Sequence, residues 1–552
     1  MSKSKSRTKE EIFSQMHREL RSWNPEIPES ADRMDPVMRI LLQLYAHQLE
    51  QIDRKVGRVW ESSANALIRA MHPESKRWPL PAFTVMRCQP GDAAVEVDRH
   101  TRFLYRDPRE GGETFYFSPL RDEKILAAEV RHLWLSYDDR LVDLSPGVGK
   151  GAAGVESIPA AGVRLHVGVA YDGAASDFGG ALLYLAGASD AIRQLRWGQW
   201  RPADKEGRFR ESAGFCPGLY TDPEKLPGVE GSPIDWGGLR SSADTFKTLE
   251  NNFVEFPGEF LAEWQAGGPE RSLAAAATGA GIELSESGEG PLYWIGIDLP
   301  EGGDRASLLT DLRLFFNCFV AVNQNEQTLF KHTGGSRLVE IEIPEDLSVI
   351  LDITGVVDSA GREYFSMHET AGDPSRRFYA LEERGRRLVL WFDFSSGIEA
   401  PPDSLTVSYT TTAGVSANGI EAGRINELYE SHPGILEVEN IIPASGAVPA
   451  KEEKQLIMEI SARLRSRDRA LTFSEVATWA RTFDPRIVEA VCANGVERAE
   501  RGIRRCIVVR LTIKAADFYS ADEVELLRTR AGSFLKARSP VNTHYKVEIR
   551  KI

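Results

Sequence analysis

The most regular hydrophobic pattern in the chain is helical and lies near the N-terminus. Asp35 and Pro36 form a helix start, with the aspartate at the N-cap and the proline in the first turn. Apolar residues then recur every three or four positions until Pro73 ends the pattern. The sequence therefore predicts one helix over residues 35–71, roughly 50 Å long at 1.5 Å per residue. Its apolar stripe comprises Val37, Ile40, Leu41, Leu44, Tyr45, Leu49, Ile52, Val56, Val59, Trp60, Ala64, Leu67 and Ile68.

An apolar stripe of this kind can pack against several kinds of surface, and the pattern alone does not indicate which one. It can pack on the core of its own domain, cover a neighbouring domain, or bind a second helix or a partner protein. A shorter helical pattern over residues 10–22 precedes it and is broken by Pro25. The two patterns together predict a helical N-terminal region over residues 1–75.

From Arg77 the helical period gives way to the two-residue alternation of strands. Short apolar runs separated by polar turns continue to residue 433, which predicts several antiparallel, sandwich-like β domains. The run Leu312–Asn323 is apolar on both faces, so we expect one central, buried strand there. Residues 338–343 alternate cleanly and predict a strand with one face in solvent. The tract 198–236 shows no period and predicts long loops.

Residues 451–552 combine helical and strand patterns. Thr472 and Glu475 have the spacing of a capping box, and an amphipathic helix with Trp479 and Phe483 in its core follows them. A two-layer α+β module is expected, in the order helix, strand, strand, helix, strand. The predicted elements are an arginine-rich helix at 451–465, the capped helix at 473–483, strands at 487–492 and 506–513 joined by a charged turn at 495–502, a helix at 522–537 and a strand at 545–549.

The whole pattern predicts an α+β chain of several domains. At 552 residues the chain is long enough for about three to five of them. The predicted divisions are long N-terminal helices at 1–75, a β-rich domain with long loops at 76–255, a sandwich-like domain at 256–433, a linker at 434–450 and the α+β module at 451–552.

Composition narrows the classes of partner and compartment. The net charge of −14 argues against a chain built around phosphates, so nucleic acid is not expected as a partner. No run of about 18 apolar residues occurs, and the first residues lack the apolar core of a secretory signal. We therefore expect neither a membrane span nor export. The five cysteines are scattered, which favours buried thiols in a reducing cytoplasm.

No catalytic or cofactor-binding motif is supported by its neighbouring residues. Gly149–Gly154 matches the glycine pattern of a dinucleotide site, but Pro159 interrupts the helix that such a site needs. The ten histidines lack zinc spacing, and no nucleophile elbow is present. The acidic pairs Asp138-Asp139 and Glu382-Glu383 are typical of solvated loops, although two convergent carboxylates could serve a glycosidase. We therefore predict no enzyme, no cofactor and no metal site.

Four arginines at every second position form the candidate protein interface: Arg463, Arg465, Arg467 and Arg469. In an extended segment they would share one face, whereas in a helix they would spread around it. Arginine binds carboxylates through a rigid fork and tolerates an interface better than lysine does. Contacts with a partner and salt bridges within the chain are both open interpretations.

Three stretches resemble a known family. The pattern Leu464-Arg465-x-Arg467-x-Arg469-Ala470-x-Thr472 is followed by a helix, Pro485, a strand ending at Cys492, a hairpin and an amphipathic helix. This order resembles the C-terminal part of baseplate J-like wedge proteins of contractile injection machines. Ala66–Pro73 with the proline-flanked lead-in Pro79–Pro90, and Phe316–Asn323 with its asparagine turn, look like TssF, a baseplate subunit of type VI secretion.

The resemblance implies a structural role. Such proteins form the wedges of a sixfold baseplate around a hub and spike and support assembly of the contractile sheath. Two TssF-like copies pair with one TssG-like subunit, and the wedge contacts a sheath-end adaptor and a membrane-docking subunit. Family members are cytoplasmic, in a baseplate docked at the inner membrane, without catalytic residues or cofactors. The alternatives are a wedge protein of a phage tail or another contractile injection system and, less favoured, a β-rich carbohydrate-active enzyme.

Overall fold

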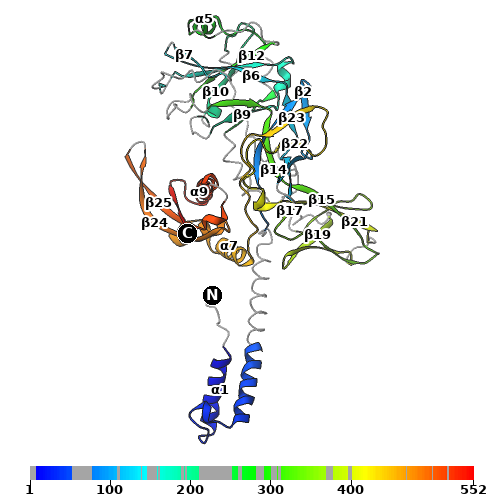
Figure 1. The fold of residues 1–552 in the computed structure, drawn as a ribbon, viewed down its shortest axis with the longest axis vertical. Coiled ribbons are helices and arrows are strands. Elements are labelled where there is room, and N and C mark those ends of the chain that lie inside the picture. The colour runs from blue at the N-terminus through cyan, green and yellow to red at the C-terminus, as the bar shows by residue number, and fades with distance from the viewer. Residues whose placement is uncertain are drawn as a thin grey trace. The chain divides into compact units, whose positions relative to one another are not determined.

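The computed structural model divides the chain into two compact units (Figure 1). The first consists of Met1–Ser75 and Glu453–Arg467, and the second of Lys76–Glu452 and Asp468–Ile552. The domain boundaries predicted from the sequence stay predictions. The structure describes residues 8–52, 78–108, 112–138, 140–145, 158–159, 162–187, 192, 195–209, 252–258, 264–280, 282, 291–299, 308, 312–367, 377–395, 401–467, 469–499, 502–518 and 521–552.

The first unit contains short helices with well-formed starts. Thr8 and Glu11 form a capping box at the start of α1 (Lys9–Trp23). Asp35 accepts hydrogen bonds from the N–H groups of Val37 and Met38, as an N-cap does, and helix 36–52 follows. The predicted start of this helix is therefore confirmed. The other elements of the unit are η1 (Ala31–Arg33) and α7 (Glu453–Ser466).

The length predicted for the N-terminal helix is not supported. The described residues show two short helices: α1, which agrees with the shorter pattern over residues 10–22, and helix 36–52 in place of the long helix expected over residues 35–71. The predicted continuation over residues 53–71 lies outside the described residues, and so does the stretch Ala66–Pro73. α1 ends at Trp23 because Pro25 cannot continue a helix.

The second unit is organised around a six-stranded sheet with the order β22-β3-β4-β14-β1-β23. All its pairings are antiparallel. β14 lies between β4 and β1, and all its residues are buried, as expected for a strand that is apolar on both faces. The strands are β1 (Phe83–Pro90), β3 (Phe103–Arg106), β4 (Thr114–Pro119), β14 (Cys318–Asn323), β22 (Glu427–Leu428) and β23 (Ile435–Asn440).

Two predictions about this sheet need correction. The run Leu312–Asn323 is not one strand, because it breaks at Asn317 and its first half, β13 (Arg313–Phe316), joins a different sheet. Asn317 has a left-handed φ of 62°, which asparagine adopts more readily than other residues with side chains. The segment 434–450, predicted as a linker, instead contributes β23 and the buried Ala447 to this part of the fold.

Residues 127–316 contain two sheets that share an aromatic core. Their orders are β10-β12-β8-β6-β7 and β11-β9-β13. The ring of the buried Phe178 lies near those of Tyr171, Trp264 and Tyr293. The other elements here are β6 (Glu129–Tyr137), β7 (Arg140–Asp143), β8 (Arg164–Ala170), η2 (Ala175–Phe178), β9 (Leu182–Ala186), η3 (Leu195–Trp197), β10 (Gln199–Pro202), β11 (Phe253–Glu255), α5 (Arg271–Gly279) and β12 (Leu292–Asp298). The predicted loop tract 198–236 is described only up to residue 209, where it contains β10.

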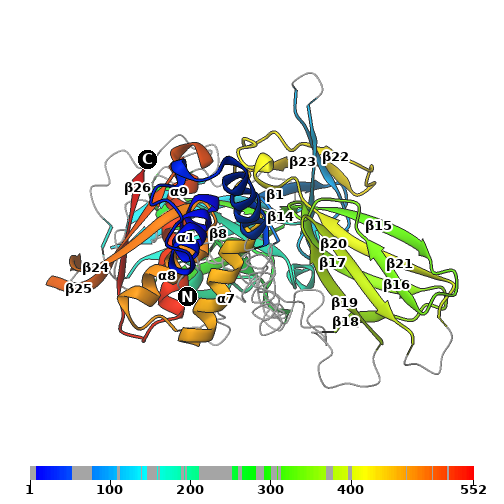
Figure 2. The same ribbon diagram turned by 90° about the horizontal axis from the view of Figure 1, so that it is seen from below.

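Residues 324–411 contain two sheets with one apolar core, the β15-β21-β17 and β16-β20-β19-β18 sheets (Figure 2, right). β16 alternates exposed and buried residues, as predicted for residues 338–343. The β18–β19 pairing is parallel. The strands are β15 (Asn325–His332), β16 (Leu338–Glu342), β17 (Ile350–Asp358), β18 (Tyr364–Ser366), β19 (Arg377–Arg384), β20 (Arg387–Asp393) and β21 (Ser404–Thr411). A separate antiparallel pair joins β2 (Ala94–Val97) to β5 (Glu123–Leu126), and η7 (Gly414–Ala417) follows β21.

Residues 469–552, called the C-terminal module below, have the predicted order helix, strand, strand, helix, strand. The capping box of Thr472 and Glu475 is present. Trp479 is buried and Phe483 is half-buried, and both rings lie near that of Phe534. β24 and β25 pair antiparallel, whereas β25 and β26 pair parallel. The elements are α8 (Phe473–Phe483), β24 (Ile487–Ala499), β25 (Gly502–Ile513), η8 (Ala515–Asp517), α9 (Ala521–Ala537) and β26 (Tyr545–Lys551).

The hairpin of this module is longer than predicted. Residues 495–499 and 502 of the predicted turn belong to the strands, since the ladder continues from Gly495 opposite Cys506 to Ala499 opposite Gly502. Glu497 and Arg504 lie directly opposite each other and form an ion pair. Cross-strand pairs of opposite charge stabilise a sheet, so these polar residues are compatible with strand as well as with turn.

Candidate assembly surfaces and domain junctions

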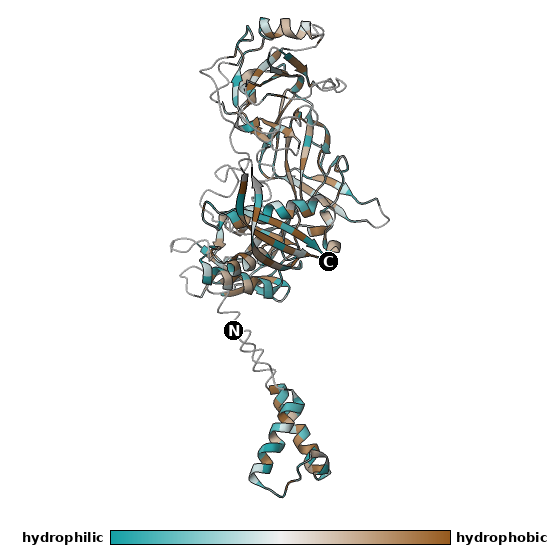
Figure 3. Cartoon of the chain, turned by 90° about the vertical axis from the view of Figure 1, so that its left-hand side faces the viewer, coloured by the Kyte–Doolittle hydropathy of each residue, from teal (hydrophilic) through white to brown (hydrophobic). Residues whose placement is uncertain are grey.

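Helix 36–52 exposes its part of the apolar stripe. Figure 3 colours hydrophobic residues of the chain brown. The seven stripe residues of this helix are between 42% and 67% exposed. The fully buried Ala46 lies roughly 180° around the helix from Val37, at about 100° per residue. Most of the stripe therefore faces away from the side that this helix buries, although Leu49 lies only about 60° around the helix from Ala46. Its residues are Val37, Ile40, Leu41, Leu44, Tyr45, Leu49 and Ile52.

Few apolar residues are buried in the segment that contains this helix. Between residues 8 and 52 they are Ile12, Met34, Leu42 and Ala46. Burying a Leu, Ile or Val side chain is worth roughly 1.5–3 kcal/mol, so the exposed stripe leaves several times that free energy unused. Contiguous exposed apolar residues mark surfaces that bind another protein. Thus this part of the stripe does not form the core of its own domain.

The four candidate arginines are divided between the two compact units. Arg463 and Arg465 lie in the last turn of α7. Arg467 follows with a left-handed φ of 50°, and Arg469 belongs to the second unit. Arg463 pairs with Glu459 one turn earlier (Nη2–Oε1 3.0 Å), an interaction within the helix. Arg465, Arg467 and Arg469 are exposed, and an interface role for them stays a proposal.

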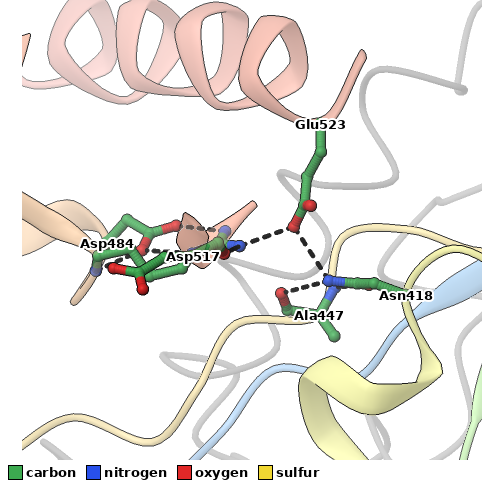
Figure 4. Close-up of polar contacts among 6 residues, drawn as sticks. Asn418, Ala447, Asp484, Asp517 and Glu523 are labelled. Atoms are coloured by element: carbon green, nitrogen blue, oxygen red, sulfur yellow. Dashed lines mark hydrogen bonds and ion pairs between the residues drawn. The ribbon is translucent and has the colours of Figure 1, made fainter. Parts of the chain in front are cut away.

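The C-terminal module buries a charged cluster that the sequence patterns do not reveal (Figure 4). Arg486 donates to both carboxylate oxygens of Asp484, from Nε (3.1 Å) and from Nη2 (2.9 Å), and to Glu523 from Nη1 (2.6 Å). These three side chains are at most 7% exposed. Burial acts to lower the pKa of Arg486, but the two carboxylates outweigh it and raise this pKa. Arg486 is therefore charged, and its guanidinium lies 4.2 Å from the centre of the Phe518 ring.

Local sequence places each member of this cluster. Asp484 is the C-cap of α8, and its carboxylate also accepts the backbone N–H of Arg486 (2.8 Å). Pro485 cannot continue the helix, so the chain turns into β24 directly after it. Glu523 lies in the first turn of α9, where the helix dipole favours a carboxylate. The available sequence signal was a pair of opposite charges flanking a proline between an amphipathic helix and an apolar strand.

Asn418 joins this cluster to the rest of the second unit. Its Nδ2 donates to Glu523 (3.0 Å) and to the carbonyl of Ala447 (3.2 Å), while its Oδ1 accepts from the N–H of Ala447 (2.9 Å). The same Glu523 oxygen accepts from Arg486 and from Asn418. One amide side chain therefore links a backbone peptide outside the module to a buried carboxylate inside it (Figure 4).

A second asparagine closes residues 127–316. Asn317 accepts from the N–H of Leu126 (2.7 Å) and donates to the carbonyl of Leu126 (2.7 Å). Because Leu126 precedes this region and Asn317 follows it, the two bonds hold its ends together. The same residue provides the left-handed turn into β14.

A third asparagine closes residues 324–411. Asn323 is 2% exposed and accepts from the hydroxyl of Thr412 (2.7 Å) and the N–H of Ala413 (2.8 Å). It also donates to the carbonyl of Tyr116 in β4 (2.9 Å). The asparagine turn after the apolar run is thus a buried junction and not a surface feature.

The pair most like a catalytic dyad is Ser136 and His166, with 2.8 Å between Oγ and Nε2. Burial and, next, the guanidinium of Arg164 lower the pKa of His166 to about 4, although Asp298 acts in the opposite direction. The imidazole is therefore neutral at physiological pH. His166 is only 5% exposed, so a substrate cannot contact its ring, and we interpret the pair as structural.

Other candidate chemistry gains no support from the described residues. They contain no group of three or more metal-binding side chains and no helix long and apolar enough to cross a membrane. Glu382 and Glu383 lie in β19 and not in a loop, and Glu382 accepts from the Trp391 indole (2.6 Å). Cys88, Cys318 and Cys506 are buried free thiols, and Cys492 is half-buried. Asp139, Gly149–Gly154 and Cys216 lie outside the described residues.

Comparison with known proteins gives only distant likenesses. No protein family matches the sequence, and no curated protein matches it significantly. A chain of the type VI secretion TssK-TssF-TssG baseplate subcomplex is 13% identical, with a TM-score of 0.45, over 91% of this chain and 96% of that one. A chain of the baseplate complex from the type VI secretion system is 13% identical, with a TM-score of 0.35, over 98% and 94%. A chain of the anti-feeding prophage baseplate is 8% identical, with a TM-score of 0.28, over 97% and 70%. Likeness at these levels does not assign a family or a function.

Proposed function

We propose that this chain is a structural wedge component of a type VI secretion baseplate. In this role it assembles with a TssG-like subunit around the hub and spike and supports assembly of the contractile sheath. The exposed stripe of helix 36–52 carries the proposal, because a wide apolar helix face suits a helical partner. The motifs at Phe316–Asn323 and Leu464–Thr472 support the choice of this family.

The stripe is the proposed contact with the TssG-like subunit, with two copies of this chain for each copy of the partner. Arg465, Arg467 and Arg469 are proposed as a second contact, because exposed guanidinium groups suit a partner's carboxylates. Further proposed partners are the membrane-docking subunit, the hub and spike, and the sheath-end adaptor. The proposed location is the cytoplasm, in a baseplate docked at the inner membrane. No cofactor and no catalytic step belong to this function.

Co-expression with the TssG-like subunit tests the proposal. Native mass spectrometry should show a complex with two copies of this chain and one of the partner. The double variant Leu44→Asp with Ile52→Asp should remain folded, because both residues are about half exposed, and should lose the complex. Val541→Asp is the matched control: Val541 is 92% exposed but lies outside the stripe, so this variant should bind as wild type does.

Two outcomes would contradict the proposal. A strict monomer in the presence of the TssG-like subunit would remove the wedge role. A complex that survives the double variant would show that the stripe is not the contact, even if the wedge role is correct. Binding to a phage-tail wedge partner in place of the TssG-like subunit would favour the alternative contractile machine.

A further inference from the structure

The C-terminal module is a separately packed part of the second unit. Its elements α8, α9, β24, β25 and β26 make their main contacts with one another. It has buried side chains of its own, among them Trp479, Leu511 and Leu535, whereas the apolar clusters of the three sheet regions lie within residues 82–447. The chain between residue 452 and the module runs through α7, which belongs to the first unit. Contacts through space therefore hold the module against residues 76–452.

One of these contacts is the bond between Asn418 and Glu523 (Figure 4). The amide Nδ2 of Asn418 lies 3.0 Å from Oε1 of Glu523, in the first turn of α9. Glu523 is 4% exposed and Asn418 is half-buried, so the bond is shielded from water. Polar contacts of this kind between compact parts of a chain allow the parts to move relative to each other, unlike large apolar interfaces. The junction therefore has the chemistry of a contact that can open.

Opening this bond would leave both side chains with partners. Glu523 would keep the guanidinium of Arg486, whose Nη1 lies 2.6 Å from its Oε1, and would gain water. Asn418 would keep its two bonds to Ala447, of 3.2 Å and 2.9 Å. A broken hydrogen bond is costly mainly where a buried group loses its partner. Neither side chain meets that condition here, so the junction can open at a small cost in free energy.

The bonds inside the charged cluster differ in this respect. Arg486 donates to both carboxylate oxygens of Asp484, and these two side chains are 7% and 2% exposed. Separating them would leave opposite charges buried and unpaired, which is strongly unfavourable. When Asn418 and Glu523 separate, the cluster of Asp484, Arg486 and Glu523 should therefore stay intact and move with the module.

We propose that the bond between Asn418 and Glu523 is a releasable latch, which gives the chain a docked and a released state. In the docked state Asn418 fixes the module to the peptide at Ala447. In the released state the module stays folded around its own core and changes its orientation relative to residues 76–452. A partner that binds one of these states more tightly than the other shifts the population towards it.

Distances between two spin labels, measured by double electron–electron resonance on the full chain, distinguish the two states. The labels are placed at Val415→Cys and Lys536→Cys, two exposed positions on opposite sides of the latch. Lys536 lies about 20 Å along α9 from Glu523, at 1.5 Å per residue, so a change in the orientation of the module moves its label. Cys216 and Cys492 are replaced by serine in every sample, because the other three cysteines are buried. With the latch unchanged, one narrow distance distribution is expected.

Two variants open and close the latch through charge. Asn418→Asp places a carboxylate against Glu523, so the ratio of docked to released molecules should fall at least about tenfold and the distances should broaden. Adding Glu523→Gln should restore the narrow distribution, because the glutamine amide can donate to the new carboxylate while its oxygen still accepts from Arg486. Asn542→Asp, at an exposed asparagine of the module, is the matched control and should leave the distances unchanged. The measurement needs no TssG-like subunit, so it is independent of the wedge proposal.

Four results would overturn the proposal. An unchanged distance distribution in Asn418→Asp would show that other contacts hold the module. A distribution that stays broad after Glu523→Gln is added would show that charge at this bond does not decide the state. Loss of the cooperative thermal transition in Asn418→Asp would contradict a latch, which leaves both parts folded when it opens. A broad distribution with the latch unchanged would show that the bond does not hold the module in solution.

Discussion

Helix 36–52 places most of its large apolar side chains in solvent, whereas the C-terminal module buries an aspartate, an arginine and a glutamate. Both arrangements have a free-energy cost in an isolated chain, since exposed apolar groups forgo burial and buried charges lose hydration. The two regions differ in whether other residues of the chain offset this free-energy cost. Arg486 is surrounded by partners from the chain itself, and the stripe is not. The buried charged cluster therefore fixes the internal geometry of the C-terminal module. The exposed stripe is the kind of surface that binds another protein.

The largest expected effect is in the buried cluster. Arg486→Met would leave Asp484 and Glu523 buried without their shared counter-charge, which should destabilise the chain by about 3–5 kcal/mol. Calorimetric unfolding measures this loss. The control is Arg528→Met, because Arg528 and Glu525 form an exposed pair worth less than about 1 kcal/mol. Equal losses in the two variants would mean that burial does not distinguish these ion pairs.

A buried neutral ring should make stability depend on pH. The pKa of His166 is about 4 in the folded chain against an ordinary 6.5, so the unfolded chain binds the proton more tightly. The contribution of the neutral His166 ring to the free energy of unfolding is therefore complete above pH 6.5. It declines by about 3 kcal/mol as the pH falls towards 4. Thermal midpoints measured between these pH values should show the loss in wild type. His166→Gln should flatten the profile, and an unchanged slope would assign the effect to other groups.

A smaller effect is expected at an asparagine junction. Asn317→Gly keeps the left-handed φ at no steric cost but removes both hydrogen bonds to Leu126. The loss should be about 1–3 kcal/mol, since the backbone groups of Leu126 lose their partner. Denaturant unfolding gives the value. Asn317→Ala adds backbone strain and should cost more, so a glycine variant as unstable as the alanine variant would show that φ is unimportant.

The smallest effect on stability is expected in the stripe. Leu44→Asp with Ile52→Asp should change the free energy of unfolding by less than about 0.5 kcal/mol, because both side chains are already in solvent. Ala46→Asp, on the buried side of the same helix, should destabilise the two-helix segment strongly. Circular dichroism melting of the full chain compares the two. A large loss in the stripe variant would show that these residues are buried within the chain in solution.

Local patterns predicted the elements better than the junctions between them. The Asp35 cap, the capping box at Thr472 and the element order of the C-terminal module depend on residues close in sequence, and each is confirmed. The break at Asn317 depends on Leu126, far away in the sequence, so no local pattern indicates it. The burial of Arg486 depends on Glu523 in the same way.

Exposure was the other quantity that the sequence could not supply. The stripe of helix 36–52 has the periodicity of a core-facing helix, and periodicity alone does not say whether the core belongs to the same chain. The arginine run shows a similar limit. The four arginines would share one face only if the segment were extended. The segment is instead helical through Arg465, because α7 continues to Ser466. Which residues reach the surface therefore depends on the three-dimensional fold and not on the local pattern.

The position of β14 in the sequence also determines when the central sheet can be completed during translation. β1 is complete at Pro90, but its neighbours β14 and β23 begin only at Cys318 and Ile435. At roughly 5–20 residues per second, a ribosome needs about 10–50 s to reach β14 after releasing β1. During that time both edges of β1 lack their native partners, while residues 127–316 emerge between them. The central sheet is therefore completed late in translation, and a nascent chain bears two unpaired strand edges until then.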